Sequence, residues 1–190
     1  MEFKLDIEAY FTKLKNTIDK LPIERINDLM NILVKAKNEE KTIFIMGNGG
    51  SSATASHFVC DFNKGVSLNR NKKFKFICLN DNIPSIMAYA NDISFEEVFV
   101  QQLKSYFQKG DVVIGISGSG NSKNVIKAIE YAISNGGVTV GITGFGGGRL
   151  KEIVECNVNI AINDMQIVED LHMALDHCMM QILSNSKYEE

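Results

Sequence analysis

The stretch Lys41–Lys64, KTIFIMGNGGSSATASHFVCDFNK, decides the fold of this chain. Its first part, Thr42–Met46, is a run of apolar, β-prone residues that is typical of a strand buried on both faces of a parallel sheet. Glycines at 47, 49 and 50 then allow a sharp turn, because glycine tolerates backbone conformations that other residues avoid. Ser51 is predicted to be the N-cap of the helix that follows. The stretch therefore predicts a strand, a tight turn and a helix in that order.

The beginning of that helix is a candidate anion-binding site. Free backbone N–H groups and the positive end of the helix dipole meet there, and both attract a phosphate. His57 and Asp61, four residues apart, share one face of the same helix just downstream. A phosphate site next to an imidazole and a carboxylate indicates chemistry on a phosphorylated small molecule. The alternative is that His57 and Asp61 form an ordinary exposed pair on a helix surface.

Strands and helices alternate along the rest of the chain, with short loops between them. Further strands are predicted at 74–79, 111–116, 138–143 and 158–162. Helices are predicted at 84–90, 95–107, 123–134, 150–154 and 166–183, with a break at Asn91 and Asp92. This alternation predicts an α/β fold with a single doubly wound parallel five-stranded sheet and helices on both faces. Residues 1–190 are expected to form one domain.

Two amphipathic helices are predicted before the first strand, within residues 1–40. Apolar side chains recur near helical spacing from Phe3 to Leu14 and from Ile26 to Val34, and Pro22 suits the start of the second helix. These helices either cover the core or form an oligomer interface, because their apolar faces must be buried somewhere.

The composition is that of an ordinary globular protein, with 45% hydrophobic and 23% charged residues. The net charge of −3 gives no electrostatic reason to expect a nucleic acid partner. No apolar run is long enough to cross a membrane, and the N-terminus has no signal-peptide core, so no membrane partner and a cytoplasmic location are expected. The cysteines are expected to be reduced thiols in the core rather than zinc ligands, because they are widely spaced: Cys60, Cys78, Cys156 and Cys178.

A second loop, Ser117–Ser122, offers the same chemistry as the first glycine turn. It places three hydroxyls and two glycines between the third predicted strand and a helix. In a parallel sheet such loops meet at the carboxyl ends of the strands, where ligands bind. Neutral hydroxyls and backbone N–H groups can hold a phosphate without a lysine. The alternative is that each serine only caps its helix.

Two nucleotide-binding patterns are excluded. No segment matches the P-loop pattern G-x-x-x-x-G-K-[ST]. The segment Gly47–Ser52 lacks the third glycine of a dinucleotide fingerprint, and the next acidic residue at a strand end, Asp81, lies too far along the chain. No nucleotide cofactor is therefore expected.

Taken together, these motifs resemble the SIS (sugar isomerase) domain family. The resemblance rests on GNGGSS at 47–52, a helix with His57 and Phe58, ISGSGNS at 116–122, and a late helix with His172 and His177. It covers essentially the whole chain. Within the family it is closest to the bacterial phosphoheptose isomerases, which convert sedoheptulose 7-phosphate to glycero-manno-heptose 7-phosphate. The resemblance implies an aldose–ketose isomerase, a homotetramer with active sites at subunit boundaries, and a role in making lipopolysaccharide or capsule precursors.

The resemblance also implies roles for individual residues. Asp61 and His177 would be the catalytic pair. A zinc ion, or another divalent metal, would be held by His57, Asp61, Glu169 and His177. The residues that bind the substrate would be Asn48, Gly49, Gly50, Ser51, Asp92, Ser117, Gly118, Ser119, Ser122 and Glu169. Helical geometry alone would place Asp170 on the face of His177 about as well as Glu169, whereas His172 is expected to be structural or interfacial.

These residue types suit the implied reaction. Aldose–ketose isomerisation moves a proton between adjacent carbons through an enediol, so it needs a base over the C1–C2 edge and a partner for the oxygens. A carboxylate and an imidazole suit these roles, and a divalent metal would polarise the carbonyl group.

The chain departs from the family pattern at several positions. Asp61 stands where the family usually has glutamate, Glu169 where glutamine is common, and Gly118 removes a side chain from the phosphate loop. An arginine expected about two turns after His57 is absent. Two alternatives remain: an isomerase for a different phosphosugar, and a non-catalytic module that senses a sugar phosphate or binds a protein. The presence of both Asp61 and His177 favours an enzyme.

Overall fold

Five parallel strands form one sheet in the order β2-β1-β3-β4-β5. The computed structural model describes residues 1–185. The strands are β1 (Ile43–Gly47), β2 (Phe76–Cys78), β3 (Val112–Ser117), β4 (Val138–Gly144) and β5 (Cys156–Ile160). β1 pairs with both β2 and β3, and every residue of β1 and β3 is buried. The loops that follow β1 and β3 therefore leave neighbouring strands at the same edge of the sheet.

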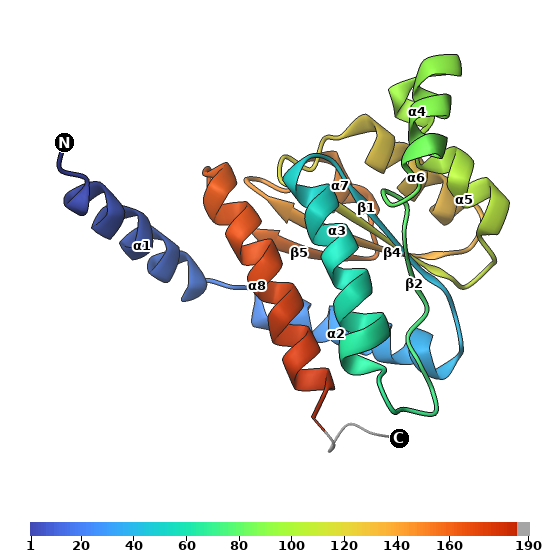
Figure 1. Ribbon diagram of the computed structural model, residues 1–190, viewed down its shortest axis with the longest axis horizontal. Coiled ribbons are helices and arrows are strands. Elements are labelled where there is room, and N and C mark those ends of the chain that lie inside the picture. The colour runs from blue at the N-terminus through green and yellow to red at the C-terminus, as the bar shows by residue number, and fades with distance from the viewer. Residues whose placement is uncertain (186–190) are drawn as a thin grey trace.

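Helices cover both faces of this sheet (Figure 1). One apolar cluster joins the sheet to α2, α3 and α8, and a second joins it to α5, α6 and α7. The predicted α/β fold, with a doubly wound five-stranded sheet and two helices ahead of the first strand, is confirmed. The α-helices are α1 (Lys4–Ile18), α2 (Ile23–Asn38), α3 (Gly50–Cys60), α4 (Ile83–Asp92), α5 (Val100–Tyr106), α6 (Lys123–Ser134), α7 (Gly148–Ile153) and α8 (Met165–Leu183). A π-helical segment, η1 (Asp61–Val66), continues α3, and a short 3-10 helix, η2 (Phe95–Glu97), precedes α5.

The N-terminal helix α1 extends away from the body of the molecule (Figure 1). Two polar contacts fix it to α8: the Tyr10 hydroxyl donates to Asp170 Oδ2 at 2.5 Å, and Lys13 Nζ lies 2.5 Å from Asp164 Oδ2. Large apolar side chains in and next to α1 remain exposed, among them Phe3, Leu5, Ile7 and Phe11. Within residues 1–185, no helix combines the length and the apolar character that a membrane span needs.

Two helix predictions were wrong in their boundaries. α4 ends at Asp92, two residues beyond the predicted end, so the break lies at Ile93 and Ser94 instead of at Asn91 and Asp92. The predicted helix 95–107 is divided instead into η2 and α5. Val98 and Phe99 lie between these two segments, and both side chains are fully buried. A single amphipathic helix buries one face only and does not normally bury two adjacent side chains completely.

The prediction that Ser51 is the N-cap of the helix after β1 is also wrong. α3 begins at Gly50, and its N-cap is Gly49, whose φ of 55° suits glycine. Ser51 instead lies inside the first turn, where it is buried.

The cysteine prediction is correct for only two of the four residues. All four are free thiols, and Cys78 and Cys156 are buried, but Cys60 and Cys178 are exposed. Each exposed cysteine lies on a helix face that the sheet does not cover.

Candidate active site

His57, Asp61 and His177 come together where α8 packs against α3. His57 lies near the end of α3, Asp61 is the first residue of the π-helical segment, and His177 belongs to α8. The Nε2 atoms of the two histidines are 3.1 Å apart, and His57 Nε2 is 3.6 Å from Asp61 Oδ2. π-Helical turns inside longer helices are frequent at functional sites, and this one begins at the carboxylate of the group.

The three side chains suit a zinc ion. One ligand atom from each lies within 4.8 Å of the other two. Zinc binds imidazole nitrogens at about 2.0–2.1 Å with tetrahedral geometry, which places two such nitrogens roughly 3.3 Å apart. The separation of 3.1 Å between the two Nε2 atoms is close to that value. Without an ion, one Nε2 must donate a proton to the other; a divalent cation would instead be bound by both lone pairs.

Glu169, the fourth predicted metal ligand, lies at the other end of α3. A Cβ atom at Gly50 would come within 2.7 Å of Glu169 Oε2, so the carboxylate faces the N-terminal turn of that helix. Glu169 precedes His177 by eight positions, or about two helical turns, and it is not one of the three clustered residues. A carboxylate is favourable at this position, because it meets the positive end of the helix dipole.

Asp176, next to His177, was not among the predicted site residues. Its side chain is fully buried, and neither carboxylate oxygen has a hydrogen-bond partner in the described part of the chain. Burial, and to a lesser extent the nearby Asp61 carboxylate, raise the pKa of Asp176 to about 8. Its environment depends on how α8 packs, which no local sequence pattern reveals.

Two other polar residues of α8 do not face the clustered residues. His172 is buried, its Nε2 lies 3.1 Å from the Thr143 carbonyl oxygen, and burial lowers its pKa to about 4. It is a neutral structural residue. Asp170 accepts the hydrogen bond from Tyr10 on α1, so its carboxylate is held on a different side of α8 from His177.

The loop after β3 brings Ser117 and Ser122 together and is braced by its own backbone N–H groups. Ser117 Oγ and Ser122 Oγ are 3.0 Å apart, and the Gly120 N–H donates to Ser117 Oγ at 3.1 Å. The Asn121 N–H donates to Ser119 Oγ at 3.2 Å. Ser122 occupies the N-cap position of α6, but its side chain makes no capping hydrogen bond. Its hydroxyl is therefore not used to cap α6 and lies against Ser117 instead, and the free N–H groups of α6 begin at the same loop.

Tight backbone contacts clamp this serine loop against the glycine-rich turn after β4. The Leu150 N–H donates to the Gly120 carbonyl oxygen, and the Gly144 N–H donates to that of Gly118, each at 2.9 Å. Gly120 has a φ of 69°, and a Cβ there would lie 1.9 Å from the Gly147 carbonyl oxygen. At Gly118 a Cβ would lie 2.5 Å from Met165 Sδ, so the missing side chain leaves room for the first residue of α8.

We expect Gly120→Ala to disrupt the serine loop. The substitution places a methyl group against backbone that cannot move aside and requires a positive φ that alanine avoids, so the free energy of unfolding should fall by about 1–3 kcal/mol. Titration with inorganic phosphate should show weaker binding. Gly146→Ala is the matched control, because a Cβ there meets nothing within 4 Å and its φ is not positive. Equal phosphate affinity in the two variants would contradict a binding role for the loop.

Asn80 and Asn124, which sequence analysis did not single out as site residues, hold the first glycine turn. Asn124 and Asn48 exchange two side-chain hydrogen bonds of 2.9 Å. Asn80 accepts from the Gly47 N–H at 3.1 Å and donates to the Gly47 carbonyl oxygen at 2.9 Å. The position of Asn80, just after the end of β2, was the available signal for that residue. Asp92, another predicted sugar contact, ends α4, a helix in which no residue is buried.

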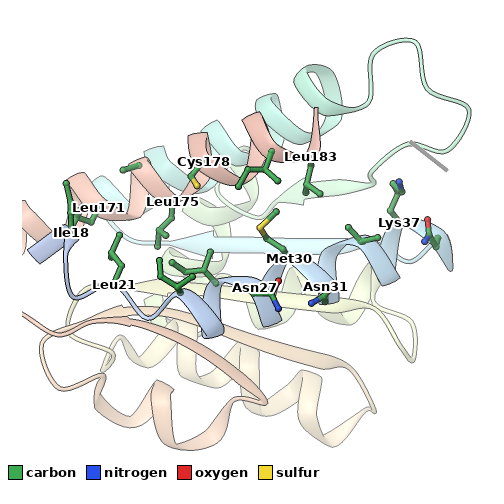
Figure 2. A pocket seen from close by; sticks show the side chains of 16 residues that line it. Ile18, Leu21, Asn27, Met30, Asn31, Lys37, Leu171, Leu175, Cys178 and Leu183 are labelled. Carbon is green, nitrogen blue, oxygen red and sulfur yellow. The ribbon is translucent and has the colours of Figure 1, made fainter. Parts of the chain in front are cut away.

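A separate apolar cavity of about 720 Å³ lies between α2 and α8. Leu171, Leu175 and Leu183 of α8 point toward Leu21 and Met30 on its opposite side (Figure 2). None of the three clustered residues lines this cavity. Its apolar lining does not suit a charged phosphosugar.

The family model described as the SIS domain matches residues 8–144 of this chain. A probable phosphoheptose isomerase from Thermoplasma acidophilum is 34% identical over 179 residues, which span 94% of this chain and 98% of the relative. A phosphoheptose isomerase from Aliarcobacter butzleri is 34% identical over 164 residues, or 86% of this chain and 85% of the relative.

Solved structures show the same fold. A phosphoheptose isomerase from Neisseria gonorrhoeae superposes with a TM-score of 0.88 over 96% of this chain and 98% of that one. Its sequence is 24% identical, so this likeness bears on the fold alone.

Proposed function

This chain belongs to the SIS domain family and, within it, to the phosphoheptose isomerases, and we propose that it converts sedoheptulose 7-phosphate to glycero-manno-heptose 7-phosphate. The family resemblance inferred from the sequence motifs is confirmed. The observation that carries the proposal is the juxtaposition of His57, Asp61 and His177, because these three side chains offer both acid–base groups and metal ligands.

Helix α8 connects this group to the serine loop. Near its start, Val168 packs close to Gly118 of the loop, and farther along the helix His177 meets His57. Val168 and His177 are nine positions apart, so about 13 Å of helix separates them. An extended seven-carbon sugar phosphate is on the order of 10 Å long, given C–C bonds of about 1.5 Å. A substrate of that length reaches from a phosphate at the loop toward the acid–base group.

In the proposed reaction the phosphate binds at the serine loop. The phosphate is assigned to four serines: Ser51, Ser117, Ser119 and Ser122. Gly118 is assigned to it as well, because a glycine lets the backbone come close to the ligand. The resemblance assigns Asn48 and Asp92 to the sugar, and it places Gly49, Gly50 and Glu169 among the substrate-binding residues. The hydrogen bond between Asn48 and Asn124 would hold the Asn48 amide in a fixed orientation for contact with the sugar.

The proton transfer is assigned to Asp61 and His177. The Asp61 carboxylate takes the proton from C1 of the ketose, and a proton is returned to C2 of the enediol to give the aldose. The His177 imidazole exchanges the proton between the two oxygens, since an imidazole both donates and accepts near neutral pH. His57 lies within 3.1 Å of His177 and holds its ring in place.

A divalent metal at His57, Asp61 and His177 would polarise the substrate carbonyl when bound. Glu169 is kept as a fourth ligand from the resemblance, although in this structure its carboxylate lies at the beginning of α3. An isomerase acting on such a charged metabolite fits the cytoplasmic location and the single SIS domain expected from the sequence.

Asp61 also supports a second candidate function, that of an isomerase for a different phosphosugar. Aspartate is one methylene shorter than the glutamate usual in the family, and proton transfer depends on distance. A shorter base suits a sugar that lies closer to α3.

An NMR time course in deuterated water tests the proposed function. Metal-replete protein is incubated with sedoheptulose 7-phosphate, and aldose carrying deuterium at C2 is the expected product, because the enediol exchanges its proton with solvent. Fructose 6-phosphate and ribulose 5-phosphate serve as comparison substrates. Faster turnover of either would favour the second candidate, and no exchange with any of the three, in folded protein, would contradict an isomerase.

We further propose that the chain forms a homo-oligomer, with a homotetramer as the expected state. The support is the apolar face of α1, which the rest of the described chain leaves uncovered, together with the apolar cavity between α2 and α8 (Figure 2). Phe11 is 61% exposed and Leu5 76% exposed, values that favour burial against a second copy.

We expect Phe11→Asp to reduce the mass of the assembly. A charge in the centre of the exposed apolar face of α1 would be buried without a partner on association, which disfavours the oligomer. Size-exclusion chromatography with light scattering measures the effect. Asn16→Asp, an exposed position on another side of α1, is the control. An unchanged mass for Phe11→Asp would exclude this face from the interface.

A further inference from the structure

The imidazole of His172 is buried in α8 and makes one directed contact with the sheet. Its side chain is 1% exposed, and its Nε2 lies 3.1 Å from the carbonyl oxygen of Thr143, near the end of β4. A carbonyl oxygen only accepts hydrogen bonds, so Nε2 carries the proton and donates it. Burial lowers the pKa of His172 to about 4, which keeps the ring neutral near neutral pH.

The other ring nitrogen, Nδ1, has no hydrogen-bond partner within residues 1–185. A buried polar atom without a partner costs free energy, and an apolar side chain of similar size would avoid that cost. An apolar side chain could not, however, donate a hydrogen bond to Thr143. The bond from α8 to β4 is therefore what histidine contributes at this position.

The end of β4 is in turn joined to the serine loop. Directly after Thr143, the Gly144 N–H donates to the carbonyl oxygen of Gly118 at 2.9 Å. Val168 lies one helical turn before His172, on the same face of α8. Its methyl carbons would lie 2.5 Å from a Cβ at Gly144, and one of them 3.8 Å from a Cβ at Gly118. The first half of α8 is therefore seated against the serine loop and the strand end beside it.

A hydrogen bond at this place fixes α8 in a way that apolar packing does not. The hydrophobic effect is non-directional, so it resists small slides and rotations of a helix less than a hydrogen bond, which depends on distance and angle. His177 lies five residues beyond His172, or about 7.5 Å along the helix. A displacement of α8 would carry the His177 imidazole with it, and a misplacement of about 1 Å can reduce a rate about 100-fold.

We infer that His172 is a positioning residue, whose bond to Thr143 sets the separation between the serine loop and His177. The inference rests on the proposed function, in which the serine loop holds the phosphate and His177 acts at the other end of the sugar. His172 is buried away from the clustered residues, so it acts through α8 and not on the substrate. It thereby determines which length of sugar brings C1 and C2 to the acid–base group.

Steady-state kinetics of two variants tests this role. His172→Leu removes the donor, and we expect kcat with sedoheptulose 7-phosphate to fall about 10- to 100-fold, while the affinity for inorganic phosphate stays within about threefold of the wild type. The preference for this sugar over ribulose 5-phosphate should narrow as well. His172→Gln keeps an N–H donor at a similar reach and should recover a large part of the lost kcat.

Leu171→Ala is the matched control for lost stability. Leu171 is the neighbouring buried residue of α8 and points into the apolar cavity, away from β4 (Figure 2). Its truncation should lower the melting temperature, because it removes apolar contacts, but it leaves the bond to Thr143 in place and should keep wild-type kcat. An equal loss of kcat in Leu171→Ala, or wild-type kcat in folded His172→Leu, would overturn the positioning role.

Relaxation-dispersion NMR tests the same role without isomerase activity. The backbone amides of residues 173–177 should show exchange on the microsecond to millisecond timescale in His172→Leu, because α8 then moves between positions on the sheet, and none in the wild type or His172→Gln. Absence of this exchange in His172→Leu would overturn the role, whatever the activity of the protein. If the exchange appeared but the wild type isomerised none of the three sugar phosphates, only the proposed reaction would be contradicted.

Discussion

His177→Ala is expected to lower kcat by about 10²- to 10⁴-fold, the usual contribution of a positioned acid–base group. The loss follows from the geometry, since His177 Nε2 is 3.1 Å from His57 Nε2 and belongs to the clustered group at the end of α3. His177 is exposed, so its removal opens no cavity in the core and the fold should persist. Steady-state kinetics with sedoheptulose 7-phosphate measures the effect.

The binding of phosphate separates a catalytic role for His177 from a structural one. The serine loop lies at the other end of α8, so the affinity of His177→Ala for inorganic phosphate should equal that of the wild type. Cys178→Ala, at the next and likewise exposed position, is the control and should keep wild-type kcat. Loss of phosphate binding by a folded His177→Ala protein, or undiminished kcat, would remove His177 from the catalytic pair.

The sheet could be predicted from the sequence because its strands are buried on both faces. A strand with no solvent-facing side appears as an unbroken apolar run, and the run at 42–46 corresponds to β1, in which every residue is buried. The helix limits between 83 and 107 could not be predicted in the same way. There, α4 continues for two residues beyond its predicted end, and Val98 and Phe99 are buried between η2 and α5, which no local pattern indicates.

The candidate site was predictable in part. His57 and Asp61 follow from helical spacing, because residues four apart share a helix face. His177 is 120 positions from His57, and only the family resemblance connected the two. Asn124 and Asp176 gave no signal, since a polar residue in a helix is exposed or buried according to the packing of the whole chain. Tertiary contacts therefore hold the information that the sequence patterns lack.

Asp61→Asn is expected to reduce kcat by about 10²- to 10⁴-fold as well, because the amide keeps the size of the side chain but cannot accept the proton. The variant should fold at least as well as the wild type. Asp61 raises the pKa of Asp176 and so disfavours its ionised form, and removing the Asp61 charge relieves that repulsion. Thermal unfolding and steady-state kinetics together distinguish loss of the base from loss of the fold.

Asp61→Glu tests whether a carboxylate is needed and how far it must reach. It restores the charge with one more methylene, so it should recover at least tenfold more activity than Asp61→Asn. Glu155→Gln, an exposed position just before β5 at the opposite edge of the sheet, controls for a general effect of charge removal. If Asp61→Asn kept wild-type turnover, another group would have to remove the C1 proton. If Asp61→Glu were faster than the wild type on the heptose phosphate, the shorter aspartate would have to serve a different sugar.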